Sequence, residues 1–242
     1  MELVLSIEAC LNAGAEKVIA AVPYFGYARQ CKRRNRGEPL SARIVANLIG
    51  NAGAKAILTV DVHEPRILDQ LAVPVVNVRV EDAVAQAIGN AFPTVFKPVI
   101  VAPDEGGAER VRRVSESLGL PFAVLEKRRE YPRQKAHAVV KECSVATLKG
   151  GQAIIVDDMV TTGNTLAAAA RALRREGAEV LGAVCTHGVL TSHAANQLAE
   201  AHLPRLIVSD SLPLPSSPPF LQRFSVAPLL ADAIAQLLRG GR

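Results

Sequence analysis

One stretch of the chain, from Ala153 to Leu166, constrains the fold more than any other, and it reads AIIVDDMVTTGNTL. The apolar run 153–156 predicts a buried strand, and the LAAAARALRRE segment that begins at Leu166 predicts a helix. A short apolar strand that runs through a polar turn into a helix is typical of α/β folds with parallel sheets. We therefore expect an α/β chain in which this turn lies at the carboxyl end of a strand.

The turn itself combines carboxylates, hydroxyls and glycine. Backbone N–H groups at a helix N-terminus attract an anion, and the helix dipole strengthens that attraction. Adjacent carboxylates accept hydrogen bonds from vicinal hydroxyls. The combination favours a phosphorylated sugar over an ordinary acidic turn with a threonine N-cap, and it resembles the ribose-5-phosphate loop of the type I phosphoribosyltransferase fold. The candidate residues are Asp157, Asp158, Thr161, Thr162, Gly163 and Thr165.

Composition narrows the class of protein further. Aromatic residues make up only 4% of the 242 residues and tryptophan is absent, so aliphatic side chains must fill the interior. Such an interior suits helices layered on a parallel sheet, and the length allows one large or two small domains. The formal net charge of +5 is spread along the chain apart from two basic runs, 32–36 and 127–129. Neither run has interleaved aromatic residues, which argues against nucleic acid as a partner.

The sequence also bears on membranes and redox state. The charge-free stretch 180–199 contains histidine, serine, threonine and asparagine, so we expect no membrane span. Residues 1–15 are apolar, but Glu2 and Glu8 stand where a signal peptide has a basic region and an uninterrupted apolar run. We therefore predict an amphipathic helix there and not a signal peptide. The four cysteines are widely scattered without metal-ligand spacing, which favours reduced thiols in a cytoplasmic protein.

A pattern of helix, glycine and apolar strand recurs at Gly14, Gly53 and Gly177, which we expect to end helices with positive φ. Alternating strands and helices imply parallel sheets with right-handed crossovers. The predicted strands are 18–23, 57–61, 73–80, 97–102, 121–125, 153–156, 180–187 and 206–210. The predicted helices are 41–52, 81–91, 106–118, 165–176 and 227–239. We place a domain boundary near Arg79, so that 1–79 with 226–242 form one domain and 80–225 form the other. The Pro/Ser-rich segment 211–220 predicts a connection on the protein surface.

Two polar segments follow strands of the first domain. The loop 22–41 carries aromatic residues, Arg29 and Gln30, which suit a nucleotide base or phosphate, although a solvated loop has the same composition. In TVDVHE, Asp61 and His63 lie two residues apart at a strand end, a spacing that lets both converge on one metal–phosphate assembly.

Two further segments follow strands of the second domain. In VAPDEGGAERV, Gly106 and Gly107 let backbone N–H groups approach a polyphosphate, and Asp104 suits Mg²⁺ directly or through water. The alternative is a glycine-rich turn. The segment 125–134, LEKRREYPRQ, predicts a cationic flap that closes over a transferring phosphoryl group, or else a solvated hairpin.

Taken together and in order, these segments resemble the ribose-phosphate pyrophosphokinase family over almost the whole chain. The segments that carry the resemblance are VPYFGYARQ, GEPLSARIVANLI, GAKAILTVDVHE, VAPDEGG, EKRR, VDDMVTTGNT and CTHGVL. The resemblance implies an α/β fold of two type I phosphoribosyltransferase-like domains, with parallel sheets flanked by helices. Family chains begin with a stretch that precedes Met1, so we expect a truncated first domain and a homo-oligomer or a partner subunit that covers it.

The resemblance also implies a reaction. Pyrophosphate is transferred from ATP, with Mg²⁺, to the anomeric hydroxyl of ribose 5-phosphate, giving phosphoribosyl pyrophosphate and AMP. It implies that Arg29, Gln30 and His63 contact ATP, and that His63 and Asp104 contact the metal. Asp104, Gly106 and Gly107 would form the pyrophosphate loop, and Lys127 and Arg129 would contact the transition state. Asp157 and Asp158 would bind the ribose hydroxyls, and Thr161, Thr162, Gly163 and Thr165 would bind the 5-phosphate.

The chain departs from the family pattern at Cys31, where many members have aspartate, and at Asn164, where glycine or alanine is usual. Two alternatives stay open. One is a non-catalytic relative that regulates or scaffolds true synthetases, against which the retained Lys127 and Arg129 argue. The other is a phosphoribosyltransferase that consumes the activated sugar, which the YARQ and PDEGG segments disfavour.

Overall fold

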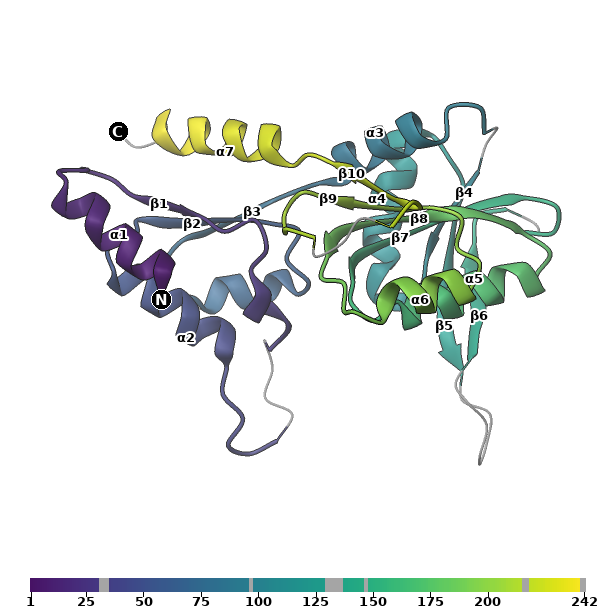
Figure 1. Cartoon of the computed structure of the whole chain (residues 1–242), viewed down its shortest axis with the longest axis horizontal. Coiled ribbons are helices and arrows are strands. Elements are labelled where there is room, and N and C mark those ends of the chain that lie inside the picture. The colour runs from purple at the N-terminus through teal and green to yellow at the C-terminus, as the bar shows by residue number, and fades with distance from the viewer. Residues whose placement is uncertain (31–34, 96–97, 129–136, 146–147, 215–217, 240–242) are drawn as a thin grey trace. The chain divides into compact units, whose positions relative to one another are not determined.

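The computed structural model describes the chain except residues 31–34, 96–97, 129–136, 146–147, 215–217 and 240–242 (Figure 1). The chain divides into two compact units: unit 1 comprises Met1–Val80 with Val226–Arg242, and unit 2 comprises Glu81–Ser225. The α/β class expected from the sequence, with parallel sheets flanked by helices, is confirmed. In the part of the chain described, no helix is both long and apolar enough to cross a membrane.

Unit 1 is built on a three-stranded parallel sheet in the order β1-β2-β3. The central strand β2 is buried along its whole length, because its sequence AILTV has apolar residues on both faces apart from one threonine. The core of the unit includes Ile7, Ile49, Ile57 and Ile67. The elements of unit 1 are α1 (Glu2–Asn12), β1 (Ile19–Ala21), η1 (Gly26–Arg29), α2 (Ser41–Asn51), β2 (Ala56–Val60), η2 (Pro65–Gln70), β3 (Val75–Val78) and α7 (Ala227–Arg239).

Unit 2 is built on a seven-stranded sheet in the order β10-β9-β8-β7-β4-β5-β6. All neighbouring strands are parallel except β5 and β6, which form an antiparallel hairpin at the sheet edge. The elements of unit 2 are α3 (Glu81–Ala91), β4 (Val99–Ala102), η3 (Glu105–Gly107), α4 (Ala108–Leu118), β5 (Phe122–Arg128), β6 (His137–Cys143), β7 (Gln152–Val160), α5 (Asn164–Arg175), β8 (Glu179–Gly188), α6 (Ala194–Glu200), β9 (Leu206–Ser209) and β10 (Leu221–Phe224).

Helices cover both faces of this second sheet. Figure 1 shows α5 and α6 on one face and α3 on the other, and α4 packs against α3. Side chains that alternate along the strands fill the two layers. Val101 and Ile155 lie opposite each other on β4 and β7 and share one buried cluster with Leu166 and Leu173 of α5.

The secondary structure agrees with much of the sequence-based expectation. The predicted helices at 81–91 and 227–239 coincide with α3 and α7. The predicted helix-ending residues Gly14, Gly53 and Gly177 have φ values of 92°, 103° and 79°. Helix 106–118 was predicted too long, because residues 105–107 form a 3₁₀ turn before α4 begins.

The expectation for three strands was wrong. We expected β7 to end at residue 156, but it continues to Val160, since Met159 and Val160 extend the ladder with β8. Asp157 and Asp158 therefore lie within the strand and not after it. The strands β6 and β10 were missed: β6 lies just beyond the predicted 125–134 flap, and β10 begins at the residue after the Pro/Ser-rich segment 211–220.

Candidate functional site

The chemistry-bearing segments of unit 2 meet at the point where the sheet changes winding direction. From β4 the chain crosses through α4 to β5, whereas from the adjacent β7 it crosses through α5 to β8 on the other side. In open α/β sheets, ligands bind at the carboxyl ends of the strands at such a switch point. The glycine loop 104–107 and the segment 157–165, which runs from the end of β7 into α5, lie at this edge, because β4 and β7 are parallel neighbours.

The first loop places two glycines at the start of α4. Asp104 Oδ1 accepts a hydrogen bond from the Gly106 N–H at 3.1 Å, and the Asp104 carbonyl accepts one from Gly107 at 3.2 Å. A Cβ on Gly106 would lie 3.2 Å from Asp104 Oδ1, so a larger residue would require the carboxylate to shift. The backbone N–H groups of both glycines thus hold Asp104 at the start of the loop.

The acidic pair on β7 interacts electrostatically with the first loop. The pKa of Asp157 is raised well above its usual range, first by burial and then by the negative charge of Asp158, with a smaller contribution from Asp104. Arg110, in the first turn of α4, partly offsets this rise. Asp158 itself is 5% exposed. The strand and the loop thus bring Asp104, Asp157 and Asp158 into one electrostatic cluster.

Arg110 is a site residue that the sequence reasoning missed. It stands three residues after Gly107 on a helix that is otherwise rich in charged side chains, so it looked like part of a solvated face. Side chains in a helix point back toward its N-terminus, which directs an arginine of the first turn toward the preceding loop. This direction of the side chain, together with the position of Arg110 in the GGAER segment, is the sequence signal that could have identified Arg110 as a site residue.

The second loop lies at the N-terminus of α5. Gly163 adopts a left-handed conformation with φ 80° and ψ −8°, and α5 begins at the next residue, Asn164. Asn164, where family members usually have glycine or alanine, is helical, and Gly163 is the residue with left-handed backbone. The Thr161 carbonyl accepts a hydrogen bond from the Thr191 N–H at 3.1 Å, which joins the loop to the end of β8.

The hydroxyls of this loop face a helix N-terminus. The Asn164 N–H lies 3.5 Å from Thr162 Oγ1, Thr162 is exposed, and Thr165 is half-buried in the first turn of α5. The unpaired N–H groups of a first helical turn and its dipole favour an anion. All four predicted phosphate residues, Thr161, Thr162, Gly163 and Thr165, are therefore brought together on one short segment after the acidic pair.

The predicted nucleotide residues lie in unit 1, after two neighbouring parallel strands. Arg29 closes η1 after β1, and Gln30 follows it, exposed, with its side-chain oxygen accepting a hydrogen bond from the Ser41 hydroxyl. His63 is exposed just beyond β2, and Asp61 before it has the left-handed φ of 45°. Because β1 and β2 run parallel, these residues share one edge of the small sheet.

The predicted metal residues belong to different units, His63 to unit 1 and Asp104 to unit 2. Within the residues described, no group of three or more His, Cys, Asp or Glu side chains is placed to hold a metal ion. Mg²⁺ does not need such a cage, because it is commonly held by one or two carboxylates together with phosphate oxygens and water. Asp104 in its acidic cluster could hold Mg²⁺ in this way, as one carboxylate among phosphate oxygens and water.

Of the two predicted catalytic cations, Lys127 lies within the described part of the chain. The backbone of Lys127 lies in β5, opposite Ala138 of β6, while Arg129 lies outside the described residues. Strand β5 adjoins β4, and η3 contacts both strands. The hairpin that carries Lys127 therefore lies beside the Asp104–Gly107 loop.

Comparison with known proteins connects this geometry to one family. The phosphoribosyl transferase domain family matches residues 71–205, and the N-terminal domain of ribose phosphate pyrophosphokinase matches residues 1–53. The ribose-phosphate pyrophosphokinase of Ralstonia nicotianae is 34% identical over 244 residues, which cover 99% of this chain and 75% of that protein. Ribose-phosphate pyrophosphokinase 2 of Schizosaccharomyces pombe is 36% identical over 244 residues, with the same coverage.

A solved structure agrees with these relatives. The crystal structure of phosphoribosylpyrophosphate synthetase from Mycobacterium smegmatis superposes with a TM-score of 0.85 at 35% sequence identity. The match covers 100% of this chain and 78% of that one. The similarity thus extends over both units and not over the sugar loop alone.

Proposed function

The chain belongs to the ribose-phosphate pyrophosphokinase family, and on this premise we propose that it transfers pyrophosphate from ATP to the anomeric hydroxyl of ribose 5-phosphate. The products are phosphoribosyl pyrophosphate and AMP. The observation that carries the proposal is the meeting of the glycine loop and the acid–hydroxyl loop at the β4–β7 switch point. The match over both units favours this reaction over that of a phosphoribosyltransferase.

The sugar is assigned to the loop between β7 and α5. Asp157 and Asp158 accept hydrogen bonds from the ribose hydroxyls, and Thr161, Thr162, Gly163 and Thr165 surround the 5-phosphate. The helix N-terminus at Asn164 supports the anion assignment. The raised pKa of Asp157 supports the carboxylate assignment, because hydroxyl donors would stabilise a charged form that burial disfavours.

The pyrophosphoryl group is assigned to the glycine loop. Gly106 and Gly107 carry no side chain and let its oxygens approach the loop, and Arg110 adds a positive charge beside the acidic cluster. Lys127 and Arg129 stabilise the negative charge that spreads over the group during transfer. Arg29, Gln30 and His63 bind ATP in this proposal.

Mg²⁺ is the proposed cofactor, held by Asp104 directly or through water, with His63 as a second contact. When bound, it neutralises phosphate charge and orients the transferred group. The support in this chain is the acidic cluster: burial first, and then the charges of Asp158 and Asp104, raise the pKa of Asp157, and a cation would offset the repulsion between these charges.

We also propose that the chain works in the cytoplasm as a homo-oligomer or with a partner subunit. The large apolar side chains that are most exposed among the described residues all belong to unit 1: Met1, Leu5, Tyr27, Ile44, Leu48 and Leu238. Large apolar side chains exposed on one unit are consistent with a surface that another subunit covers. The free thiols of Cys10, Cys143 and Cys185 suit a reducing compartment.

The deciding experiment is release of AMP from ATP by the purified chain with and without ribose 5-phosphate. Ribose-dependent AMP release, with one phosphoribosyl pyrophosphate formed for each AMP, is expected. Omission of Mg²⁺ should abolish it. AMP or ADP release that ignores the sugar, or binding of ribose 5-phosphate without turnover, would refute the proposal; the second result would indicate a non-catalytic relative.

A further inference from the structure

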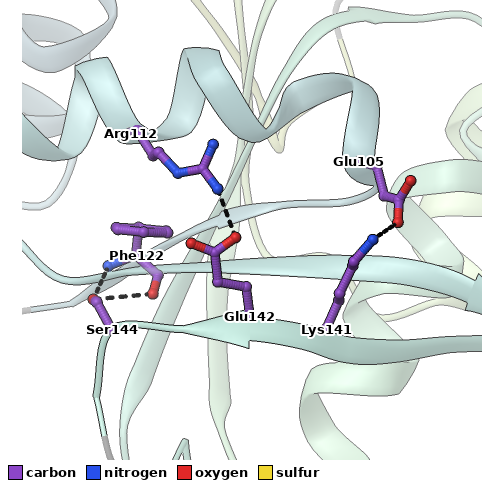
Figure 2. A network of polar contacts seen from close by, with 6 residues as sticks. All are labelled: Glu105, Arg112, Phe122, Lys141, Glu142 and Ser144. Carbon is purple, nitrogen blue, oxygen red and sulfur yellow. Dashed lines mark hydrogen bonds and ion pairs between the residues drawn. The ribbon is translucent and has the colours of Figure 1, made fainter.

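The edge strand β6 contains a bulge at Lys141. The ladder pairs Val124 of β5 with Glu142 and Leu125 with Val140, so the register skips Lys141. In a regular strand, Lys141 and Glu142 would point to opposite faces of the sheet. A bulge breaks this alternation and re-aims a side chain, and bulges are common beside active sites. Figure 2 shows both side chains directed toward the same side, where α4 and the loop before it lie.

Each of these two side chains binds a different part of the segment that follows β4. Lys141 Nζ forms an ion pair with Glu105, which stands between Asp104 and Gly106 (Figure 2). Glu142 binds Arg112 of α4, with 2.6 Å between the guanidinium nitrogen and the carboxylate oxygen. The bulged strand therefore contacts both the glycine loop and the helix that the loop begins.

The base of the hairpin is fastened separately. The Phe122 N–H donates to Ser144 Oγ at 2.8 Å, and the Ser144 N–H donates to the Phe122 carbonyl at 2.9 Å. The Arg112 guanidinium lies 5.5 Å from the centre of the Phe122 ring (Figure 2). These contacts hold the base of the hairpin, so the Lys141–Glu105 pair is not needed there and contacts the hairpin nearer the site.

We propose that Lys141 and Glu105 are positioning residues that join strand β6 to the Asp104–Gly107 loop and hold the two segments in a fixed position relative to each other. The hairpin carries Lys127 and the loop carries Asp104, Gly106 and Gly107. The pair thus sets the position of the β5–β6 strand pair relative to the loop that is proposed to receive the pyrophosphoryl group. The consequence for turnover rests on the proposed function, whereas the coupling of the two segments does not.

The exposure of the Lys141–Glu105 pair indicates that the pair aligns the two segments and contributes little to the folding stability of the chain. The side chains of Lys141 and Glu105 are 49% and 57% exposed, and ion pairs with such exposure contribute little to folding. Glu105 is the largest cause of the raised pKa of Lys141, and Glu126 and Glu142 add smaller contributions of the same sign. The lysine therefore lies among three carboxylates, of which Glu105 alone belongs to the glycine loop.

Hydrogen–deuterium exchange of the whole chain tests the coupling without any substrate. Lys141→Met should raise exchange in both β6 and residues 105–107, and Glu105→Gln should do the same. The double variant should exchange no faster than either single variant, because each removes the same contact. Glu179→Gln is the matched control: it removes an exposed carboxylate that accepts a hydrogen bond from Gln152 at the far ends of β7 and β8. Faster exchange confined to one of the two segments would overturn the inference.

Steady-state kinetics then test the role in turnover. Lys141→Met and Glu105→Gln should each lower kcat about two- to fivefold, the scale of an exposed ion pair, with little change in the KM for ribose 5-phosphate. The charge-reversed pair Glu105→Lys with Lys141→Glu should restore most of kcat, whereas each reversal alone should not. Additive losses in the double variant, or a rise in KM without loss of kcat, would refute the positioning role. If the wild-type chain releases no AMP, the proposed reaction fails while the exchange result still decides whether the two segments are coupled.

Discussion

Asp157 Oδ1 accepts a hydrogen bond of 3.0 Å from the backbone N–H of Asp158, its neighbour in the acidic pair. Despite this donor, the pKa of Asp157 is raised well above its usual range, because burial and the charge of Asp158 outweigh the attraction of Arg110. The folded chain therefore holds a proton on Asp157 more tightly than the unfolded chain does. The site is destabilised by its own negative charge when no ligand is bound.

The first prediction concerns the pH dependence of stability. An unfolded aspartate loses its proton near pH 4, whereas folded Asp157 loses it at a higher pH, so the unfolding free energy decreases as pH rises through that window. Asp157→Asn removes the titrating carboxyl and therefore this decrease in the unfolding free energy. Its Tm should exceed that of the wild type at pH 8 by about 2–4 °C, the shift expected for about 1 kcal/mol in a chain of this size. At pH 4 the two proteins should unfold alike; an equal gain at both values would refute the linkage.

The second prediction separates the two ligands. Asp158→Asn should weaken ribose 5-phosphate binding about 10- to 100-fold, the scale of a lost charged hydrogen bond, and leave ATP binding nearly unchanged. Calorimetric titration with each ligand measures both affinities. Glu176→Gln, at the opposite end of α5 and exposed, is the control and should change neither. Unchanged sugar affinity in Asp158→Asn would contradict the assignment of the acidic pair.

Much of this site followed from short-range sequence chemistry. The Gly106–Gly107 turn, the acidic pair and the threonine loop were predicted because each consists of consecutive residues at or near the carboxyl end of a strand, where local rules apply, although the acidic pair lies inside β7 and not after it. Arg110 and Lys141 were not predicted, because their contacts depend on packing. Arg110 reaches the site through the direction of a helical side chain, and Lys141 through a register shift that exists only once β5 and β6 have paired.

The third prediction concerns the hairpin cation. Lys127→Ala should lower kcat about 10²–10³-fold, the loss typical of a group that stabilises transition-state charge, with little effect on ribose 5-phosphate affinity. Initial-rate measurements combined with sugar titration separate the two quantities. Lys149→Ala removes an exposed lysine from the turn before β7 and should keep full activity. Parallel losses of sugar affinity and turnover in Lys127→Ala would place Lys127 in the sugar site instead.

The last prediction concerns the backbone of the sugar loop. Gly163 has φ 80°, and a Cβ there would lie 3.0 Å from Leu198 Cγ. Gly163→Ala must therefore either strain the loop or displace Leu198 of α6, at a cost of about 1–3 kcal/mol. We expect a lower Tm and weaker binding of ribose 5-phosphate, because the N-terminus of α5 can no longer keep its position under the 5-phosphate.

Gly89→Ala is the control for this substitution, since Gly89 lies within α3 and a Cβ there meets nothing within 4 Å. It should stabilise the chain by about 0.5–1 kcal/mol through helix propensity and leave sugar affinity unchanged. Combining Gly163→Ala with Leu198→Ala separates the two causes of the loss. If steric contact with Leu198 dominates, the double variant should recover sugar affinity; if backbone strain dominates, it should not. Normal sugar affinity in Gly163→Ala alone would show that the left-handed turn at Gly163 is not needed to hold the phosphate.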